Sequence, residues 1–299
     1  MKKITGYIRA TRRAALSVAA VPAILGLTAV QGLIAGPVFR NYTAIPNTLY
    51  RMTRRMIGIK VVFNSASAPL VKDKPVWFVA NHITAADAVV LAGVLDGTFV
   101  GKGDIMKWPV IAQMARTVKF IGVRRSAEYN AQSRAKIIKN INAGFNIIMF
   151  PEGTTNEGKD IYMFHAGLIT SLFGEKGIDK KNKEVLLKKE VVVQPVAIRI
   201  KSVNGKDALN DEQLRESYIM SHEKKTLKRI WKRMMVKNIT MELTALSPLR
   251  PADFKDAREL INKAALDVAG IVNPGQTVFE KAKIPVYAKK SGNKKTSAP

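Results

Sequence analysis

The chain of 299 residues contains no cysteine. A disulfide-stapled scaffold, a zinc site with Cys ligands, an iron–sulfur cluster and a thiol nucleophile are therefore excluded. Histidine is also scarce, since only His82, His165 and His222 occur. Apolar residues make up 47% of the chain and charged residues 24%, which excludes a disordered or low-complexity protein. The sequence is therefore that of a folded protein.

Acidic residues are absent before Asp73, although eleven basic residues precede it. The whole chain carries a formal net charge of +26, which requires a polyanionic neighbour: nucleic acid, an anionic membrane or an acidic protein. No recognisable nucleic-acid-binding motif accompanies this charge, and aromatic residues make up only 7%. We therefore expect anionic membrane lipids, and no nucleic acid, as partners.

An uncharged run of 26 residues, Ala14 to Phe39, lies within this acid-free segment. It is long enough to cross a bilayer, which needs about 20 apolar residues. Basic residues flank both ends, and Pro and Gly interrupt the run, which favours re-entrant or interfacial helices over a simple span. A signal peptide and a buried core helix are the alternatives. The expected location is a membrane, at its cytoplasmic face, and the inner membrane if the source is bacterial.

The remaining sequence predicts an α/β fold, because short β-branched runs alternate with segments of helical period. We expect three parts: membrane-associating helices over 1–57, one domain with a mixed central sheet flanked by helices over 58–272, and a Lys-rich disordered tail over 273–299. The expected strands are 58–63, 75–80, 98–101, 118–123, 146–150, 191–200 and 238–246. The expected helices are 84–94, 104–115, 127–143, 215–236 and 253–269. Within the fourth helix, 221–238 is amphipathic and basic, which suits an interfacial helix or a helix packed on the sheet.

His82 follows the apolar strand predicted at 75–80, and Asp87 falls in the first turn of the next helix, for which Thr84 is a natural N-cap. From there the carboxylate of Asp87 can reach back to the imidazole. One ring nitrogen would then donate to Asp87, and the other could take a proton from a hydroxyl. A satisfied, half-buried histidine beside a capping aspartate is the simpler alternative.

Two more predicted strands end in functional groups. One is followed by Glu152, Gly153 and Thr154, where the glycine can bring backbone N–H groups close to an anion. Another ends in Arg124 and Arg125, two guanidiniums suited to a phosphate or carboxylate. We expect these groups at the same sheet edge as His82, the usual place for a site in an open α/β sheet.

Four ordered blocks resemble those of the glycerolipid acyltransferases, the lysophosphatidate acyltransferase-like group with an H-x4-D motif. They are NHITAAD (81–87), GVRRS (122–126), FPEGTTN (150–156) and VVVQPVAI (191–198). The resemblance implies that His82 is the catalytic base and Asp87 its orienting partner. It also implies an acceptor-binding set comprising Lys102, Arg124, Arg125, Glu152, Gly153 and Thr154.

The implied reaction moves an acyl group from a thioester, on acyl carrier protein or coenzyme A, to the hydroxyl of a lysolipid. The implied acceptor is 1-acyl-glycerol 3-phosphate, and no metal or cofactor is expected. One departure favours an alternative acceptor, such as a lyso-ornithine lipid or a lysophospholipid: Thr155 stands where the family usually has Arg. A non-catalytic module that binds lipid or a carrier protein is the alternative of another class.

Overall fold

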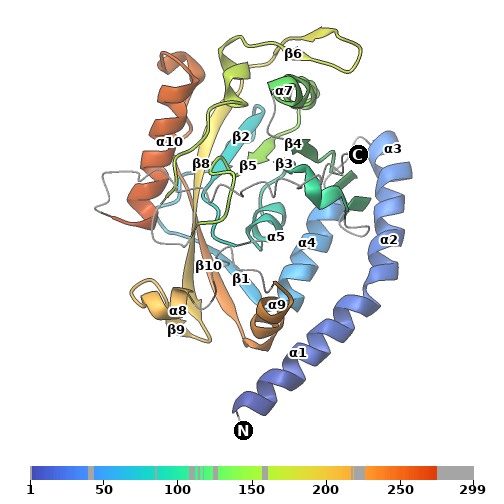
Figure 1. Cartoon of the computed structure of the whole chain (residues 1–299), viewed down its shortest axis with the longest axis vertical. Helices are drawn as coiled ribbons and strands as arrows, with labels where there is room; N and C mark the ends of the chain where they lie inside the picture. Colours follow the sequence, from blue (N-terminus) through green and yellow to red (C-terminus); the bar gives the residue numbers. More distant parts are fainter. Residues whose placement is uncertain are drawn as a thin grey trace, which may run out of the picture.

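The computed structural model describes residues 2–39, 44–84, 86–107, 112–113, 115–116, 118–123, 127–156, 161–216, 218 and 226–274. At the centre of the molecule is a sheet with the strand order β1-β10-β8-β2-β5-β3-β4 (Figure 1), and a short β9 (Lys206–Asp207) pairs with β8. Its strands are β1 (Ile59–Phe63), β2 (Val76–Ala80), β3 (Thr98–Lys102), β4 (Ile121–Val123), β5 (Ile147–Met149), β8 (Val192–Val203) and β10 (Ile239–Ala245). All seven lie where the sequence predicts strands.

The sheet is mixed. Strands β8, β2, β5, β3 and β4 are parallel, whereas β10 runs antiparallel to β8 and β1 runs parallel to β10. The carboxyl ends of the five parallel strands therefore meet at one edge. The predicted α/β class with a mixed central sheet is confirmed.

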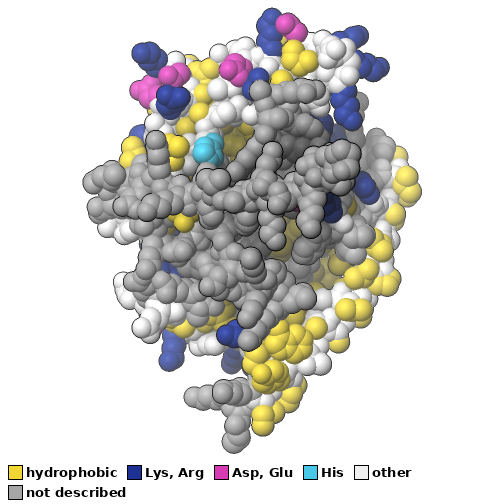
Figure 2. Space-filling model, viewed as in Figure 1, with side chains coloured by type: hydrophobic (Ala, Val, Ile, Leu, Met, Phe, Trp, Pro, Cys, Tyr) yellow, Lys and Arg dark blue, Asp and Glu magenta, His cyan; other side chains and the backbone are white. Residues whose placement is uncertain are grey.

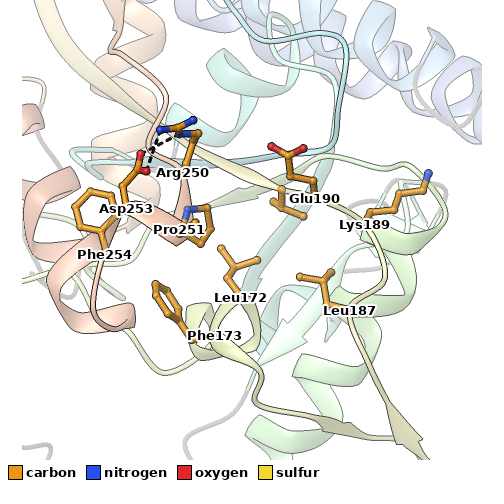
Figure 3. Close-up of a pocket in the computed structure, with 11 residues that line it drawn as sticks. Leu172, Phe173, Leu187, Lys189, Glu190, Arg250, Pro251, Asp253 and Phe254 are labelled. Atoms are coloured by element: carbon orange, nitrogen blue, oxygen red, sulfur yellow. Dashed lines mark hydrogen bonds and ion pairs between the residues drawn. The ribbon is translucent and has the colours of Figure 1, made fainter.

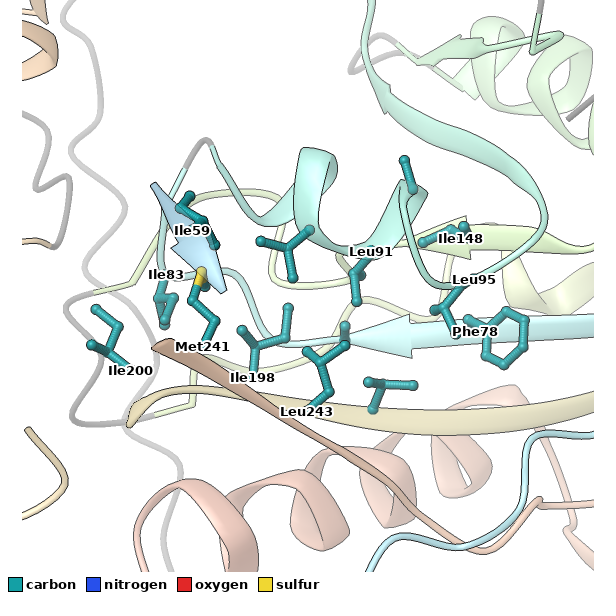
Figure 4. Packing of buried hydrophobic residues seen from close by; sticks show 14 of the residues in the cluster. Ile59, Phe78, Ile83, Leu91, Leu95, Ile148, Ile198, Ile200, Met241 and Leu243 are labelled. Carbon is teal, nitrogen blue, oxygen red and sulfur yellow. The ribbon is translucent and has the colours of Figure 1, made fainter. Parts of the chain in front are cut away.

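Helices cover both faces of the sheet. Helices α4 (Ala44–Met56) and α5 (Asp87–Ala92) pack on one face, and α7 (Ala127–Asn142) and α10 (Ala257–Val272) pack on the other. Along β2, Phe78 contributes to the first core and Trp77 to the second. Figure 4 shows the first core, with Leu91 and Leu95 beside the side chains of the sheet. Because β2 is buried on both faces, its sequence is a continuous apolar run.

Several helices differ from their predicted bounds. The expected helix over 215–236 is interrupted: α8 (Glu212–Glu216) and α9 (Thr226–Met235) are separate, and Tyr218 lies in a turn with its side chain buried. Helix α10 starts at Ala257 because Asp256 caps it. The Asp256 side chain accepts hydrogen bonds from the backbone N–H groups of Arg258 and Glu259. The predicted helix over 104–115 begins as a 3-10 turn, Gly103–Lys107. The charged stretch 174–190 carries a small hairpin, β6 (Gly177–Ile178) and β7 (Glu184–Val185).

The N-terminal segment is helical and lies along one edge of the molecule (Figure 1). It comprises α1 (Lys2–Ala19), α2 (Val21–Val30), a π-helical turn (Gln31–Ala35) and α3 (Gly36–Phe39). Residues Ile4–Ala35 are long and apolar enough to cross a membrane, judged by length and composition alone. Apolar side chains gather along this edge in Figure 2, and those of Ile8, Val18 and Leu33 are 65%, 73% and 77% exposed. Large exposed apolar surface of this kind is typical of a membrane or protein interface.

Candidate active site

The candidate site lies where β2 and β5 end. These strands are parallel neighbours, with Val79 opposite Met149. Asn81 and His82 follow β2, and Glu152 lies three residues beyond β5. The sheet therefore brings His82 and Glu152 to the same edge, as the sequence predicts.

His82 and Asp87 are in direct contact. The ring Nδ1 of His82 lies 2.9 Å from Oδ2 of Asp87. The Asp87 side chain is fully buried, whereas the His82 side chain remains 20% exposed. The expected pairing of imidazole and carboxylate is present in the structure, with the carboxylate inside and the ring edge open to solvent.

Asp87 is held by the backbone as well as by the histidine. Its Oδ2 accepts hydrogen bonds from the N–H of Ile83 at 2.7 Å and of Thr84 at 2.8 Å. An oxygen that already accepts two N–H donors also accepts from the ring, so Nδ1 of His82 carries its hydrogen. Nε2 is then the nitrogen with a lone pair, which is the state a general base needs.

This arrangement also changes the start of α5. The regular helix begins at Asp87, with its N-cap position at Ala86. Thr84 nevertheless makes the bonds expected of a cap: its Oγ1 accepts from the Ala86 N–H at 2.8 Å, and its own N–H donates to the Asp87 carboxylate at 2.8 Å.

Phe150 fixes the plane of the imidazole. The two rings are stacked, with centroids 4.2 Å apart and an interplanar angle of 15°. Phe150 is the first residue after β5, so the second strand supports the side chain that follows the first. Together, the hydrogen bond to Asp87 and the stacked ring hold His82 in one orientation.

Glu152 is buried beneath the same turn, with only 3% of its surface exposed. Its Oε1 accepts from the backbone N–H of His82 at 2.7 Å, and its Oε2 accepts from that of Tyr162 at 3.0 Å. Asn156 donates to both oxygens through Nδ2, at 3.0 and 2.9 Å. The carboxylate is thus satisfied from within the protein and supports the loop that carries His82.

Burial also changes the acidity of Glu152. Removal from water raises its pKa to about 8, although the hydrogen bonds from Asn156, His82 and Tyr162 act in the opposite direction. The resemblance implied that this carboxylate helps to bind the acceptor. Its burial and its four hydrogen bonds show that it supports the loop that carries His82, and its contact with an acceptor stays a prediction.

Gly153 and Thr154 continue this turn toward the surface. Gly153 is exposed and has φ +67°, a conformation that L side chains rarely adopt. A Cβ at this position would lie 3.7 Å from Cδ2 of His165, so this histidine borders the turn. Thr154 and Thr155 follow as partly buried residues. The glycine therefore leaves the surface beside Glu152 open.

Of the expected basic groups, Lys102 is the one within the described residues. Lys102 is the last residue of β3, which is the second strand from β2 in the sheet. Its side chain is 82% exposed, and its Nζ lies 3.7 Å from Oδ2 of Asp104. Arg124 and Arg125 follow β4 but lie outside the described residues. Lys102 is thus at the predicted edge, in solvent.

Two asparagines that the sequence did not single out complete the site. The Asn156 backbone N–H donates to the His82 carbonyl at 2.6 Å, so this residue holds both the histidine and Glu152. Asn81 is fully buried and exchanges two hydrogen bonds with the backbone of Ile198 on β8. Asn81 directly follows the apolar strand β2, which is the signal in the sequence that could have identified it, whereas Asn156 lies seven residues after β5 and has only its place in the FPEGTTN block.

A separate hollow of about 600 Å³ lies at the opposite edge of the sheet, where β8 begins. Figure 3 shows its apolar lining by Leu172, Phe173 and Leu187, with Arg250 paired to Asp253 at its rim. His82 follows the other end of the parallel strands. This hollow therefore takes no part in the site around His82.

Comparison with known families places this geometry in context. Residues 60–199 match the family model described as Acyltransferase. The segment 60–199, slightly less than half of the chain, therefore carries the sequence signature of the acyltransferase family. The matched residues include the His82–Asp87 pair and the buried Glu152, so the part of the chain that forms the site is the part that carries the family signature.

Relatives with curated names are similar over part of the chain. A lyso-ornithine lipid O-acyltransferase from Brucella abortus is 30% identical over 162 residues, which cover 54% of this chain and 57% of that protein. A 1-acyl-sn-glycerol-3-phosphate acyltransferase from Neisseria gonorrhoeae is 28% identical over 94 residues, which cover 31% of this chain and 36% of that protein. The chain spans about half the length of the lyso-ornithine lipid relatives it matches.

A solved structure shares the fold. The crystal structure of the 1-acyl-sn-glycerophosphate (LPA) acyltransferase PlsC from Thermotoga maritima aligns with a TM-score of 0.63 and 18% identity, over 91% of this chain and 96% of that one. This structural alignment covers more of the chain than residues 60–199, so the similarity of fold includes helices and strands outside the segment that matches the family model.

Proposed function

We propose that this protein is a membrane-associated O-acyltransferase that moves an acyl group from a thioester to the hydroxyl of a lysolipid. The observation that carries the proposal is the His82–Asp87 contact of 2.9 Å, in which a buried carboxylate orients a partly exposed imidazole. The family match over 60–199 supports the reaction class.

In this proposal, His82 acts as the general base and Asp87 holds it in the required tautomer. The acceptor hydroxyl gives its proton to Nε2 of His82 while its oxygen bonds to the thioester carbonyl carbon. The carbon–sulfur bond then breaks, and the departing thiolate takes the proton back from the imidazolium, which the Asp87 carboxylate stabilises until then. A thioester is already activated, so this route requires no metal or other cofactor.

We favour a lyso-ornithine lipid as the acceptor. Lyso-ornithine lipid O-acyltransferases are among the relatives with the longer matched segments. Thr155 supplies no positive charge where the glycerolipid acyltransferases usually have Arg, and a headgroup without phosphate needs none there. The second candidate is 1-acyl-glycerol 3-phosphate, since similar proteins act on it by name and since Lys102 lies at the edge of the site.

The donor and the location belong to the same proposal. A chain of net charge +26 attracts acyl carrier protein, which is acidic, and coenzyme A, which carries phosphates. The apolar helices α1–α3 with their basic flanks suit attachment to anionic lipids at the cytoplasmic face of a membrane.

The test is a mass-spectrometric assay of the purified protein in vesicles. Acyl-coenzyme A and acyl carrier protein thioesters are each offered with lyso-ornithine lipid, 1-acyl-glycerol 3-phosphate and a neutral lysolipid. The proposal expects a new ester from at least one acceptor, and a faster rate with lyso-ornithine lipid. Absence of any ester with every donor and acceptor would contradict the reaction class, and a preference for the phosphate-bearing acceptor would overturn the choice of headgroup.

A further inference from the structure

Helix α1 presents an unusual pair of faces. Gly6, Ala10 and Arg13 are buried, whereas Ile4 and Ile8 are 64% and 65% exposed. In most surface helices, the apolar stripe is the buried one. Here the small residues and an arginine face the protein, and the large apolar residues face outward.

The buried face of α1 packs on α9, the helix that precedes β10. A Cβ at Gly6 would come within 3.1 Å of Cε of Met235, so the two helices approach as closely as a glycine allows. Figure 1 shows α9 lying between α1 and the sheet. Helix α9 therefore makes the most extensive contact between α1 and the domain, and α4 makes a smaller one with α1 and α2.

Arg13 closes this contact with hydrogen bonds. Its guanidinium donates to the carbonyls of Met234 at 3.0 Å, Val236 at 2.5 Å and Lys237 at 2.9 Å. Arg9, one turn earlier, donates to the carbonyl of Met235 at 2.6 Å. Carbonyls at the end of a helix lack partners within it and carry partial negative charge, so an arginine there is stabilising. Arg13 is 6% exposed although it belongs to a helix with an apolar outer face.

The acceptors of Arg13 lie on the same side of the sheet as the candidate active site, where β8 continues from Val196, the partner of the last β2 residue, to Val203. They immediately precede β10, whose first residue Ile239 pairs with Val203 at the end of β8. Strand β8 is parallel to β2, and β2 leads into His82. Gly58, just before β1, also packs on the guanidinium: a Cβ there would collide with Arg13.

From these contacts we propose that Arg13 is the joint that fixes the apolar helices α1–α3 to the segment between α9 and β10, on the side of the sheet that carries the candidate active site, and so sets the position of the site relative to the bilayer. The proposal rests on the proposed function, because it assigns Arg13 a positioning role in acylation at a membrane. Arg13 acts through α9 and touches no reacting atom. Substitution of Arg13 therefore lowers the rate of acylation of acceptors embedded in a bilayer and leaves the rate unchanged for acceptors that reach the site from solution.

The kinetic test compares Arg13→Ala with Arg12→Ala. Arg12 is the adjacent, exposed residue, so both variants lose the same charge from the same helix. Each is assayed with long-chain lyso-ornithine lipid and 1-acyl-glycerol 3-phosphate in phosphatidylglycerol vesicles, and with hexanoyl forms of both as monomers in solution. We expect Arg13→Ala to lose about tenfold or more of kcat/KM on the vesicle acceptor while keeping its kcat on the monomeric one. Arg12→Ala should have the wild-type kcat on the monomeric acceptor and a higher kcat/KM than Arg13→Ala on the vesicle acceptor. Arg9→Ala should lose less kcat/KM on the vesicle acceptor than Arg13→Ala does.

Equal losses on both forms of acceptor would assign Arg13 a merely structural role, and equal rates for Arg12→Ala and Arg13→Ala would also overturn the proposal. Wild-type protein that acylates no acceptor would count against the proposed function instead. In that case a structural measurement can still test whether Arg13 fixes α1 to the domain.

Because the chain has no cysteine, Ile4→Cys and Lys206→Cys provide two unique positions for spin labels.

The distance distribution between these labels in vesicles should be narrow with Arg13 present and broad with Arg13→Ala. Arg13→Lys, which keeps the charge but cannot reach all three carbonyls, should be intermediate and guards against a variant that fails to fold. A narrow distribution in all three proteins would mean that Arg13 does not fix α1 to the domain.

Discussion

The backbone N–H of His82 donates to Oε1 of Glu152 at 2.7 Å, across 70 positions of sequence. This hydrogen bond ties the loop after β2 to the loop after β5 at the point where the candidate base leaves the sheet. Since Asn156 bonds both to Glu152 and to the His82 carbonyl, the two loops form one unit. The orientation of the imidazole therefore depends on a carboxylate that is itself buried.

Glu152→Gln is expected to lower kcat and leave the KM for the acceptor unchanged. The amide group of Gln would face N–H donors that now meet a carboxylate oxygen, so at least one of them would lose its acceptor. An unsatisfied buried donor costs roughly 1–3 kcal/mol, which corresponds to about a 10–100-fold loss when it misplaces the base. Steady-state kinetics of this variant beside Glu190→Gln, which removes an exposed carboxylate, measure the effect. A raised KM with an unchanged kcat would instead indicate direct contact between Glu152 and the acceptor.

The stability of the protein should depend on pH through the same residue. Burial raises the pKa of Glu152 from 4.5 to about 8, so the folded protein keeps a proton that the unfolded chain releases near pH 4.5. This contribution to stability is fully present below pH 4.5 and is lost as the pH rises to about 8. Urea unfolding between pH 5 and pH 9 should therefore show the free energy of unfolding of wild type falling relative to that of Glu152→Gln. A difference between the two proteins that stays constant over this range would contradict the assignment.

Asp87→Asn should reduce the rate by about 100-fold or more, since the imidazolium formed during proton transfer would lose its buried counter-charge. The amide oxygen of Asn can still accept from Nδ1 and from the backbone N–H groups of Ile83 and Thr84, so the fold should persist. Circular dichroism and single-turnover kinetics separate the two effects. Wild-type turnover by a folded Asp87→Asn protein would exclude the pair as the catalytic unit.

Thr155→Arg is expected to shift acceptor preference toward 1-acyl-glycerol 3-phosphate. A charge-assisted hydrogen bond to phosphate is worth roughly 1.5–3 kcal/mol, so the ratio of kcat/KM for this acceptor to that for lyso-ornithine lipid should rise about tenfold or more. Thr155→Gln adds comparable length without charge and serves as the control. If both variants change the ratio equally, side-chain size and not charge determines the preference.

The sequence predicts the sheet well because each strand is a short apolar or β-branched run that stands out from its neighbours. Strand β4 is shorter than predicted since Lys119 has φ +54°, a turn conformation that no pattern of hydrophobicity reveals. The regular part of α5 starts at Asp87, three residues later than predicted, although Thr84 and Asp87 exchange hydrogen bonds typical of a helix N-terminus.

Within the site, the sequence predicts the contact between His82 and Asp87 because the two are close along the chain. The position of Glu152 is harder to predict, since a carboxylate in a motif gives no sign of whether it points outward or inward. Its burial follows from Asn156 and Tyr162, whose donors reach it only once the chain between them has folded back. Long-range hydrogen bonding to a buried carboxyl group is a property of the fold.

The central claim is that His82 removes the proton from the acceptor hydroxyl, and His82→Ala tests it most directly. Ester formation from acyl thioester and lysolipid is measured by mass spectrometry for wild type, His82→Ala and His222→Ala, with vesicle binding and circular dichroism recorded for each. We predict that His82→Ala binds vesicles and folds as wild type does but loses at least about 100-fold in rate, while His222→Ala retains full activity. Ester formation by His82→Ala at the wild-type rate would contradict the account.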